Sequence, residues 1–264
     1  TWGAPCCCDG PGRQACLGAA QLRFATILQE LVDDLPALRA RVGAVELGGV
    51  VAGRMARAVS RAAGTAFATP MAAVAGAVAD EVLLAMRAAG DMHRAYVNNG
   101  GDIALHLGRD ARFKIALAGL DGQRLGDLTL TCDHEIGGIA TSGRGGRSLT
   151  QGVADSVTVL AESAAIADAA ATLIANATDL PSHPAVQRQR ANQVDPDSDL
   201  GDRLVVTGVR TLAASDRCRA LDDGQSLARA LIAKGIIRGA ALFLQGDCRA
   251  VGLSHDLNER LIYA

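Results

Sequence analysis

The spacing of hydrophobic and polar residues changes near Gly90. Before that glycine, apolar residues recur at helical intervals over 21–34, 36–43 and 50–64. After it, short alternating or apolar runs are separated by Gly and Asp, which is the pattern of strands joined by tight turns. Helices and strands therefore come in blocks, without regular alternation of strand and helix. This order predicts an α+β fold.

The helical part contains one segment with clear end signals. Thr69 can cap a helix that has Pro70 in its first turn and ends at Gly90. Within it, residues 72–79 are almost all Ala, Gly or Val, so this surface has little side-chain bulk. Such a surface lets a ligand approach closely; tight packing against another helix is the alternative.

The remaining elements are predicted from the same helical and strand periodicities. We expect an antiparallel meander after Gly90, then a strand, a small-residue helix, a polar excursion, a strand, a helix and a final hairpin turning at Gly246-Asp247. The ranges are, in the same order, 94–99, 102–108, 112–119, 126–132 and 135–142 for the meander, then 156–162, 163–177, 180–202, 203–209, 224–235 and 239–254.

Composition narrows the class of protein. Of 264 residues, 49% are hydrophobic and 20% charged, which is typical of a globular chain. The net charge of −2, without a basic run, argues against a nucleic-acid partner. No apolar run reaches the roughly 18 residues of a membrane span. We expect a loose N-terminal segment over 1–20, rich in Gly, Pro and Cys, and a single domain over 21–264.

The seven cysteines are odd in number and irregularly spaced, which argues against a disulfide framework. A reducing compartment fits better, so we expect a cytoplasmic protein. Cys6, Cys7 and Cys8, together with Cys16, have the softness to bind a thiophilic metal. An incidental cluster of thiols is the alternative.

The glycine-rich stretch 137–148 fails the obvious motif tests. A phosphate-binding P-loop would need Gly where Thr141 stands and Lys where Arg147 stands. The dinucleotide fingerprint fails because Ser148 occupies its last glycine position. A hydrolase elbow fails because Ser142 lacks the two flanking glycines.

Three polar features remain, and the first is the run Asn99, Gly100, Gly101 and Asp102. Adjacent glycines let backbone amides approach a ligand, and the carboxylate can accept hydrogen bonds from it. The same residues are also well suited to a type I′ hairpin turn.

The second feature lies at the end of the predicted strand 135–142. Thr141, Ser142 and Gly143 offer two hydroxyls and exposed amides, and Arg144 and Arg147 can bind phosphate or carboxylate. A mobile glycine loop is the alternative.

The third feature is the pair Asp168 and Thr172, four residues apart in a predicted helix and therefore on one face. A carboxylate and a hydroxyl so placed can bind Mg²⁺, which prefers few protein ligands together with phosphate oxygens. Alternatively, the aspartate interacts with the helix dipole and the threonine bonds to the backbone.

Taken together, the motifs resemble the ApbE-like superfamily, whose members include the FAD:protein FMN transferases. The resemblance covers residues 65–178 and continues more weakly to about 253. It is carried by the stretches "PMAAVAGAVADEV", "VNNGGDIAL", "GIATSGRGGRSLTQGVADSVTVLAESAAIADAAATLIAN" and "GAALFLQGDCRAVG".

The resemblance implies an ApbE-like α+β domain with antiparallel sheets flanked by helices. It also implies site residues. Gly100, Gly101 and Asp102 would contact a flavin nucleotide, FAD or FMN, and Ala140 to Gly143 would line the site. Asp168 and Thr172 would bind magnesium.

Departures from the family pattern leave the activity open. Ala75 stands where the transferases have Lys before Gly76, and no aromatic pair is found to hold a flavin ring. One function is a magnesium-dependent transferase acting on a flavin nucleotide or another phosphorylated ligand. The other is a non-catalytic binding or carrier protein that keeps the pocket. A homodimer formed through the small-residue helices is a third reading.

Overall fold

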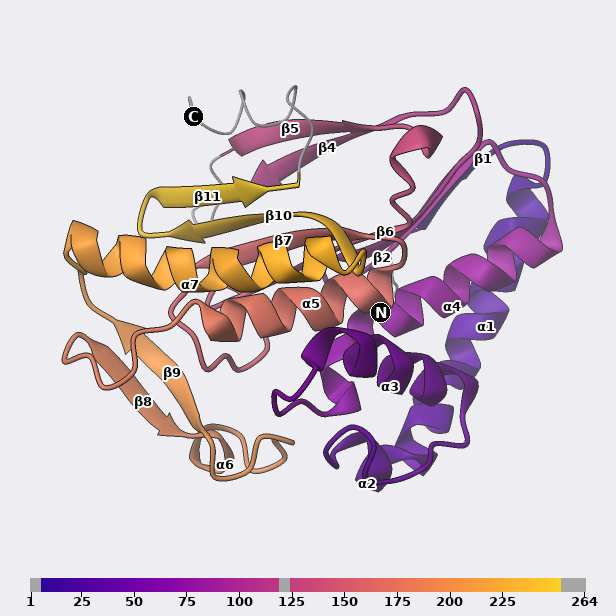
Figure 1. Cartoon of the computed structure of the whole chain (residues 1–264). Helices are drawn as coiled ribbons and strands as arrows, with labels where there is room; N and C mark the ends of the chain where they lie inside the picture. The colour runs from indigo at the N-terminus through magenta and orange to yellow at the C-terminus, as the bar shows by residue number, and fades with distance from the viewer. Residues whose placement is uncertain (1–5, 119–123, 253–264) are drawn as a thin grey trace. The chain divides into compact units, whose positions relative to one another are not determined.

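The computed structural model describes residues 6–118 and 124–252 (Figure 1). The chain divides into two compact units. Unit 1 comprises Thr1–Ile115, Thr129–Ala140 and Leu160–Ala169, and unit 2 comprises Ala116–Leu128, Thr141–Val159 and Ala170–Ala264. The single domain expected over 21–264 therefore stays a prediction.

The sheet of unit 1 is antiparallel, as predicted, but it is not the expected five-stranded meander, because the strands expected at 112–119 and 126–132 pair with each other in a separate sheet. Its strands follow one another in the order β1 (Cys6–Asp9), β2 (Arg94–Asn99), β3 (Asp102–Leu107) and β6 (Gly138–Ser142). The two-residue turn between β2 and β3 consists of Gly100 and Gly101, with φ of 72° and 113°. Both angles favour glycine, so the hairpin turn is the local structure of this motif.

Two helices of unit 1, α4 and α1, contact this sheet, and the others pack against helices. Helix α4 lies against β2 and β3, and α1 packs along α4 (Figure 1). The helices are α1 (Arg13–Asp33), α2 (Leu35–Leu38), α3 (Val50–Ala63), the 3-10 helix η1 (Pro70–Ala73) and α4 (Val74–Ala89).

Several expectations for the N-terminal third were wrong. Residues 6–20 are not loose: they form β1 and the first part of α1. The helix expected over 36–43 is only the four-residue α2. Thr69 makes no side-chain capping bond, and Pro70 begins a 3-10 turn that precedes α4. Gly90 does end α4, as expected.

Some elements connect the units along the chain. Strands β4 (Phe113–Ala118) and β5 (Arg124–Leu130) pair with each other in a two-stranded sheet, followed by η2 (Cys132–His134). Strand β7 (Ser156–Ala161) precedes α5 (Ala164–Ala177). Half of the residues of α5 are buried alanines, which is typical of a helix that is apolar on most sides.

Unit 2 contains the C-terminal hairpin with α7 alongside it (Figure 1). The polar excursion 180–202 is more ordered than expected, because it includes β8 and α6. Helix α7 begins ten residues earlier than expected, and the final turn is Gln245-Gly246. The elements are β8 (Val186–Arg190), α6 (Ala191–Val194), β9 (Leu204–Val209), α7 (Ala214–Ala233), β10 (Ile237–Leu244) and β11 (Asp247–Val251).

The small residues of unit 1 allow two backbones to touch. A Cβ added at Gly76 of α4 would stand 2.2 Å from the carbonyl oxygen of Ala164, the first residue of α5. A Cβ at Gly138 of β6 would stand 2.0 Å from the Ala164 amide nitrogen. Of the two interpretations of the small-residue surface, tight helix packing is therefore the one seen at Gly76.

We expect Gly76→Ala to lower the free energy of unfolding by about 1–3 kcal/mol, because the new methyl group overlaps backbone atoms that have no flexible end to move. Gly18→Ala is the matched control. Gly18 lies within α1 with nothing within 4 Å of its added Cβ, so this change should stabilise by about 0.5–1 kcal/mol. Urea unfolding of both variants measures the difference; equal effects would contradict the close approach.

Candidate functional site

Asp168 interacts with the N-terminus of α4. Its Oδ2 accepts a hydrogen bond from the Gly76 amide at 3.0 Å, and the Ala75 amide also bonds to this carboxyl group. These amides belong to the first turn of α4, where backbone donors have no partner within the helix and the helix dipole is positive. The predicted metal ligand is thus also a helix cap.

Asp80 makes the reciprocal interaction. It lies on α4, and its two carboxylate oxygens accept hydrogen bonds from the amides of Ala164 and Ala165 at 3.0 and 2.9 Å. These amides open α5, the helix that carries Asp168. Each helix therefore supplies the carboxylate that caps the other, at the point where Gly76 lets them touch.

Asp102 lies next to this crossing. It opens β3 directly after the Gly100-Gly101 turn and is 9% exposed. The turn itself is bonded to α4, because Asn99 Nδ2 donates to the Ala75 carbonyl at 3.1 Å. Two of the features singled out in the sequence, Asp102 and Asp168, are thereby brought together within unit 1.

The electrostatics of these carboxylates favour a cation. Asp168 keeps some exposed surface, yet its carboxyl group is surrounded by protein, and this burial raises its pKa well above the ordinary value. The negative charge of Asp102 raises the same pKa further, and Asp80 adds a smaller effect. Burial also raises the pKa of Asp80 itself. A hard cation beside Asp168 would offset this repulsion. Among the described residues, however, no group of three or more His, Cys, Asp or Glu is arranged to hold a metal ion, and that includes these aspartates.

Cysteine gives no support to a soft-metal site. Strand alternation puts the exposed Cys7 on the opposite face from Cys6 and Cys8. Cys8 instead contacts Cys16, and burial with this neighbour raises the Cys8 pKa to about 11. Within residues 6–118 and 124–252, no group of three or more His, Cys, Asp or Glu is arranged to hold a metal ion.

The glycine-rich loop in unit 2 is fixed by its own side chains. Arg144 Nη2 donates to Asp155 Oδ1 at 2.5 Å, and its Nε donates to the Val153 carbonyl at 3.2 Å. Gly143, at φ 130°, leaves no room for a Cβ beside the Asp155 carbonyl. The second Asp155 oxygen accepts the Gln245 amide at 2.6 Å. These contacts argue against the mobile-loop alternative.

This network changes which arginine is free to bind an anion. The guanidinium of Arg144 is held by Asp155, whereas Arg147 is exposed at the end of the bend. Thr141 bonds through its hydroxyl to Thr158 at 2.9 Å, and Ser142 is partly exposed. Of the two arginines expected to contact phosphate, Arg147 is therefore the better candidate.

The predicted site residues divide between the two units. Asn99, Gly100, Gly101, Asp102 and Asp168 belong to unit 1; Thr141, Ser142, Gly143, Arg144, Arg147 and Thr172 belong to unit 2. Asp168 and Thr172 do share helix α5, one turn apart. The sequence did not reveal the capping role of Asp80.

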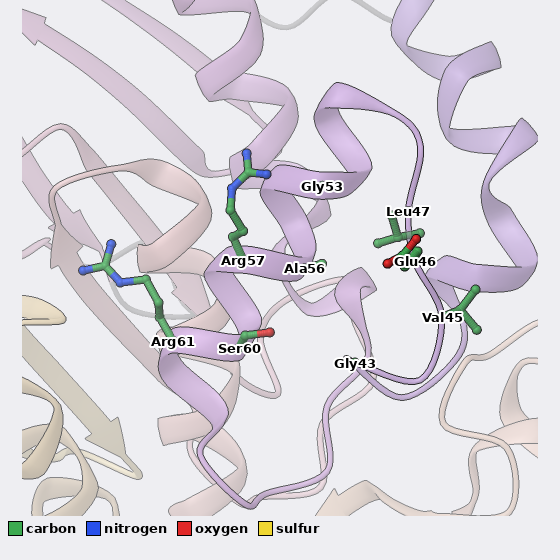
Figure 2. A pocket seen from close by; sticks show the side chains of 9 residues that line it. All are labelled: Gly43, Val45, Glu46, Leu47, Gly53, Ala56, Arg57, Ser60 and Arg61. Carbon is green, nitrogen blue, oxygen red and sulfur yellow. The ribbon is translucent and has the colours of Figure 1, made fainter.

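A separate hollow of about 560 Å³ lies beside α3 and contains none of the predicted residues (Figure 2). Val45, Glu46 and Leu47 stand on its loop side, while Arg57 and Arg61 extend from α3 away from that loop. Arg61 is also paired with Glu162. Because the polar groups do not converge on the hollow, it lacks the character of a ligand site.

The fold and the ordered motifs define an ApbE-like α+β protein, as the sequence predicted. A family model described as "AbpE bacteria" matches residues 7–250, and the chain belongs to this family.

The relatives of the chain include UPF0280 proteins. The one from Methanopyrus kandleri is 38% identical over 135 residues, which is 50% of this chain and 53% of that protein. The one from Methanocaldococcus jannaschii is 38% identical over 110 residues, or 40% and 43%. The match thus spans about half the length of these relatives or less.

Solved structures resemble the chain more distantly. The flavin transferase ApbE from Vibrio cholerae is 16% identical, with a TM-score of 0.37, over 96% of this chain and 78% of that one. The Pseudomonas stutzeri flavinyl transferase ApbE, apo form, is 13% identical, with a TM-score of 0.39, over 94% and 74%. At these TM-scores the likeness adds nothing to the family match.

In the described part of the chain, no helix is both long enough and apolar enough to span a membrane.

We expect Asp80→Ala to lower the free energy of unfolding by about 2–3 kcal/mol, because two amides of α5 would lose a charged acceptor inside the protein. Asp202→Ala is the control: this aspartate is largely exposed and pairs with Arg190 at the surface, so its loss should cost less than about 1 kcal/mol. Chemical denaturation measures both. Similar losses would show that Asp80 has no special role.

The raised pKa of Asp168 predicts a pH dependence of stability. A carboxyl group with a raised pKa in the folded state contributes stability below its unfolded pKa, near 3.9, and loses it as pH rises through the folded value. Asp168→Asn removes this loss. In the absence of divalent cations, the Tm of the Asp168→Asn variant minus that of the wild type should therefore increase from pH 4 to pH 8. A constant Tm difference across that range would contradict the raised pKa of Asp168.

Proposed function

We propose that this protein binds a flavin nucleotide, FAD or FMN, together with Mg²⁺, and that it acts as a magnesium-dependent transferase on that ligand. The observation that carries the proposal is the buried pair Asp102 and Asp168, whose mutual repulsion a cation would relieve. Membership of the AbpE bacteria family supports the link to ApbE-like chemistry.

Asp168 would hold the ion, with Thr172 one turn further along α5 supplying a hydroxyl oxygen. The chemistry that such an ion would supply when bound is polarisation of a phosphate oxygen. The amides of Gly100 and Gly101 and the carboxylate of Asp102 would position the nucleotide. Thr141, Ser142, Gly143 and Arg147, which belong to unit 2, stay the sequence-based candidates for contacts with a phosphate group.

Binding without transfer is the second candidate, and two observations favour it. Ala75 takes the place of the transferase lysine, so its side chain offers no charge at the start of α4. Arg144, the first arginine after the ATSG motif, is held by Asp155. A protein that retains its ligand without turnover would be a carrier. In either case we propose a cytoplasmic protein with a small-molecule ligand and no nucleic-acid partner.

Thermal unfolding in the presence of ligands tests the site. We expect FAD with Mg²⁺ to raise the Tm more than either does alone, because an ion held by Asp168 would also offset the charge of the phosphates. Asp168→Ala should abolish the magnesium-dependent part of the shift, whereas Asp202→Ala should keep it. Wild-type protein without a shift for FAD, FMN or ATP would overturn the proposal.

The same samples separate the two functions. Incubation of the purified protein with FAD, Mg²⁺ and a threonine-containing acceptor peptide, followed by chromatography, measures the release of AMP as the FMN phosphoryl group passes from AMP to the threonine hydroxyl. Release that Asp168→Ala abolishes supports a transferase. A Tm shift without release supports the carrier.

A further inference from the structure

Helix α1 is unusual among the helices of unit 1 because so little of it is buried. Of its 21 residues, three are buried: Cys16, Ala20 and Ile27. They recur at intervals that put them on one face. The neighbours of α1 are chiefly α4 and β1, and to a smaller extent α3 and α2. The opposite face of α1 therefore has no neighbour among the described residues of unit 1.

That opposite face is apolar. Leu22 is 77% exposed, Leu28 is 72% exposed and Val32 is 49% exposed, with the exposed Ala25 between them. At about 100° per residue, these four side chains fall within one arc of roughly 120°. Single exposed leucines are common, but large aliphatic side chains gathered on one helix face mark an interaction surface.

The same arc carries no charge. Besides the four apolar residues it contains Gln14, Gly18, Gln21 and Gln29. The charged residues of α1 lie elsewhere around the helix: Arg23 pairs with Glu30 and with Glu81 of α4, and Arg13 and Asp33 lie outside the arc. We call the uncharged arc of α1 the α1 face.

We propose that the α1 face is the surface through which two copies of this chain associate, with α1 packed against α1 of the partner around a two-fold axis. In a two-fold interface the same surface of both copies meets, so a charged residue near the axis would lie close to the same charge on the partner. A surface that carries aliphatic side chains, a glycine and glutamine amides, but no charge, can pack against a copy of itself without bringing like charges together.

Two alternatives to this proposal fit the residues less well. A helix that lies on a membrane surface is rich in Lys and Arg beside its apolar face, whereas Glu30 and Asp33 flank this one. The small-residue helices, considered from sequence as a dimer surface, are engaged with each other at Gly76 and Ala164. Their contact is internal, which leaves the α1 face for a second copy.

The size of the surface sets the expected strength. A helix of 21 residues is about 32 Å long, so one helix pair buries less than the roughly 1,600 Å² of a standard stable interface. We therefore expect a concentration-dependent dimer with a dissociation constant of about 10 μM or weaker. The monomer should be the main species in dilute solution.

Sedimentation velocity from about 1 to 500 μM tests the proposal. The wild-type protein should shift from monomer to dimer over this range. The double variant Leu22→Gln with Leu28→Gln should weaken association at least tenfold by removing apolar area without adding charge, and Leu22→Glu with Leu28→Glu should stay monomeric. The control is Leu204→Glu, at a 54% exposed leucine of β9 in unit 2, which should dimerise like the wild type.

Three outcomes would overturn the proposal. One is wild-type protein that remains monomeric at the highest concentration. Another is Leu204→Glu that weakens association as much as the α1 variants do. The third is a fall in the Tm of the dilute α1 variants by several degrees, since that would show that the face is covered within the monomer. Binding of wild-type protein to anionic vesicles, lost in the α1 variants while the protein stays monomeric, would favour a membrane instead.

Discussion

The crossing of α4 and α5 depends on two carboxylates that each cap the other helix. Asp80 of α4 accepts the first amides of α5, and Asp168 of α5 accepts amides in the first turn of α4. Helix N-termini carry unpaired donors and partial positive charge, which must be satisfied when they are buried. The exchange is possible only because Gly76 lets the α4 backbone reach Ala164. A side chain there would separate both carboxylates from their amides.

This arrangement puts negative charge where the protein has little water to solvate it. Burial raises the pKa of both Asp80 and Asp168, and Asp102 adds a third carboxylate to the same region of unit 1. The amides stabilise the ionised forms only in part. The uptake of a proton or of a cation would neutralise part of this negative charge, and the proposed magnesium site uses a cation. Structural capping and ligand binding are then two uses of one residue, Asp168.

Elements with a strong local signal could be predicted from sequence. Helices α3 and α5 and strands β2 and β3 have clear periodicity, and the Gly100-Gly101 turn follows from its residues. Residues 6–20 were misjudged because Gly, Pro and Cys suggest a loop, whereas pairing with β2 and packing on α4 order them. Arg144 was assigned to phosphate because its partner Asp155 is eleven residues away, in contact only after the chain bends back. No local pattern reports such a partner.

The sequence by itself determined the α+β class, most strands and helices, and the identity of Asp102 and Asp168 as candidate site residues. It could do so because period, turn chemistry and motif order are local properties of the chain. Only the tertiary structure decided that these two aspartates share one region, that Asp80 caps α5, that Arg144 is occupied, and that α1 presents an uncharged apolar face. Each of these depends on which distant groups meet and which remain exposed, and burial, pKa and partner choice exist only after folding has brought them together.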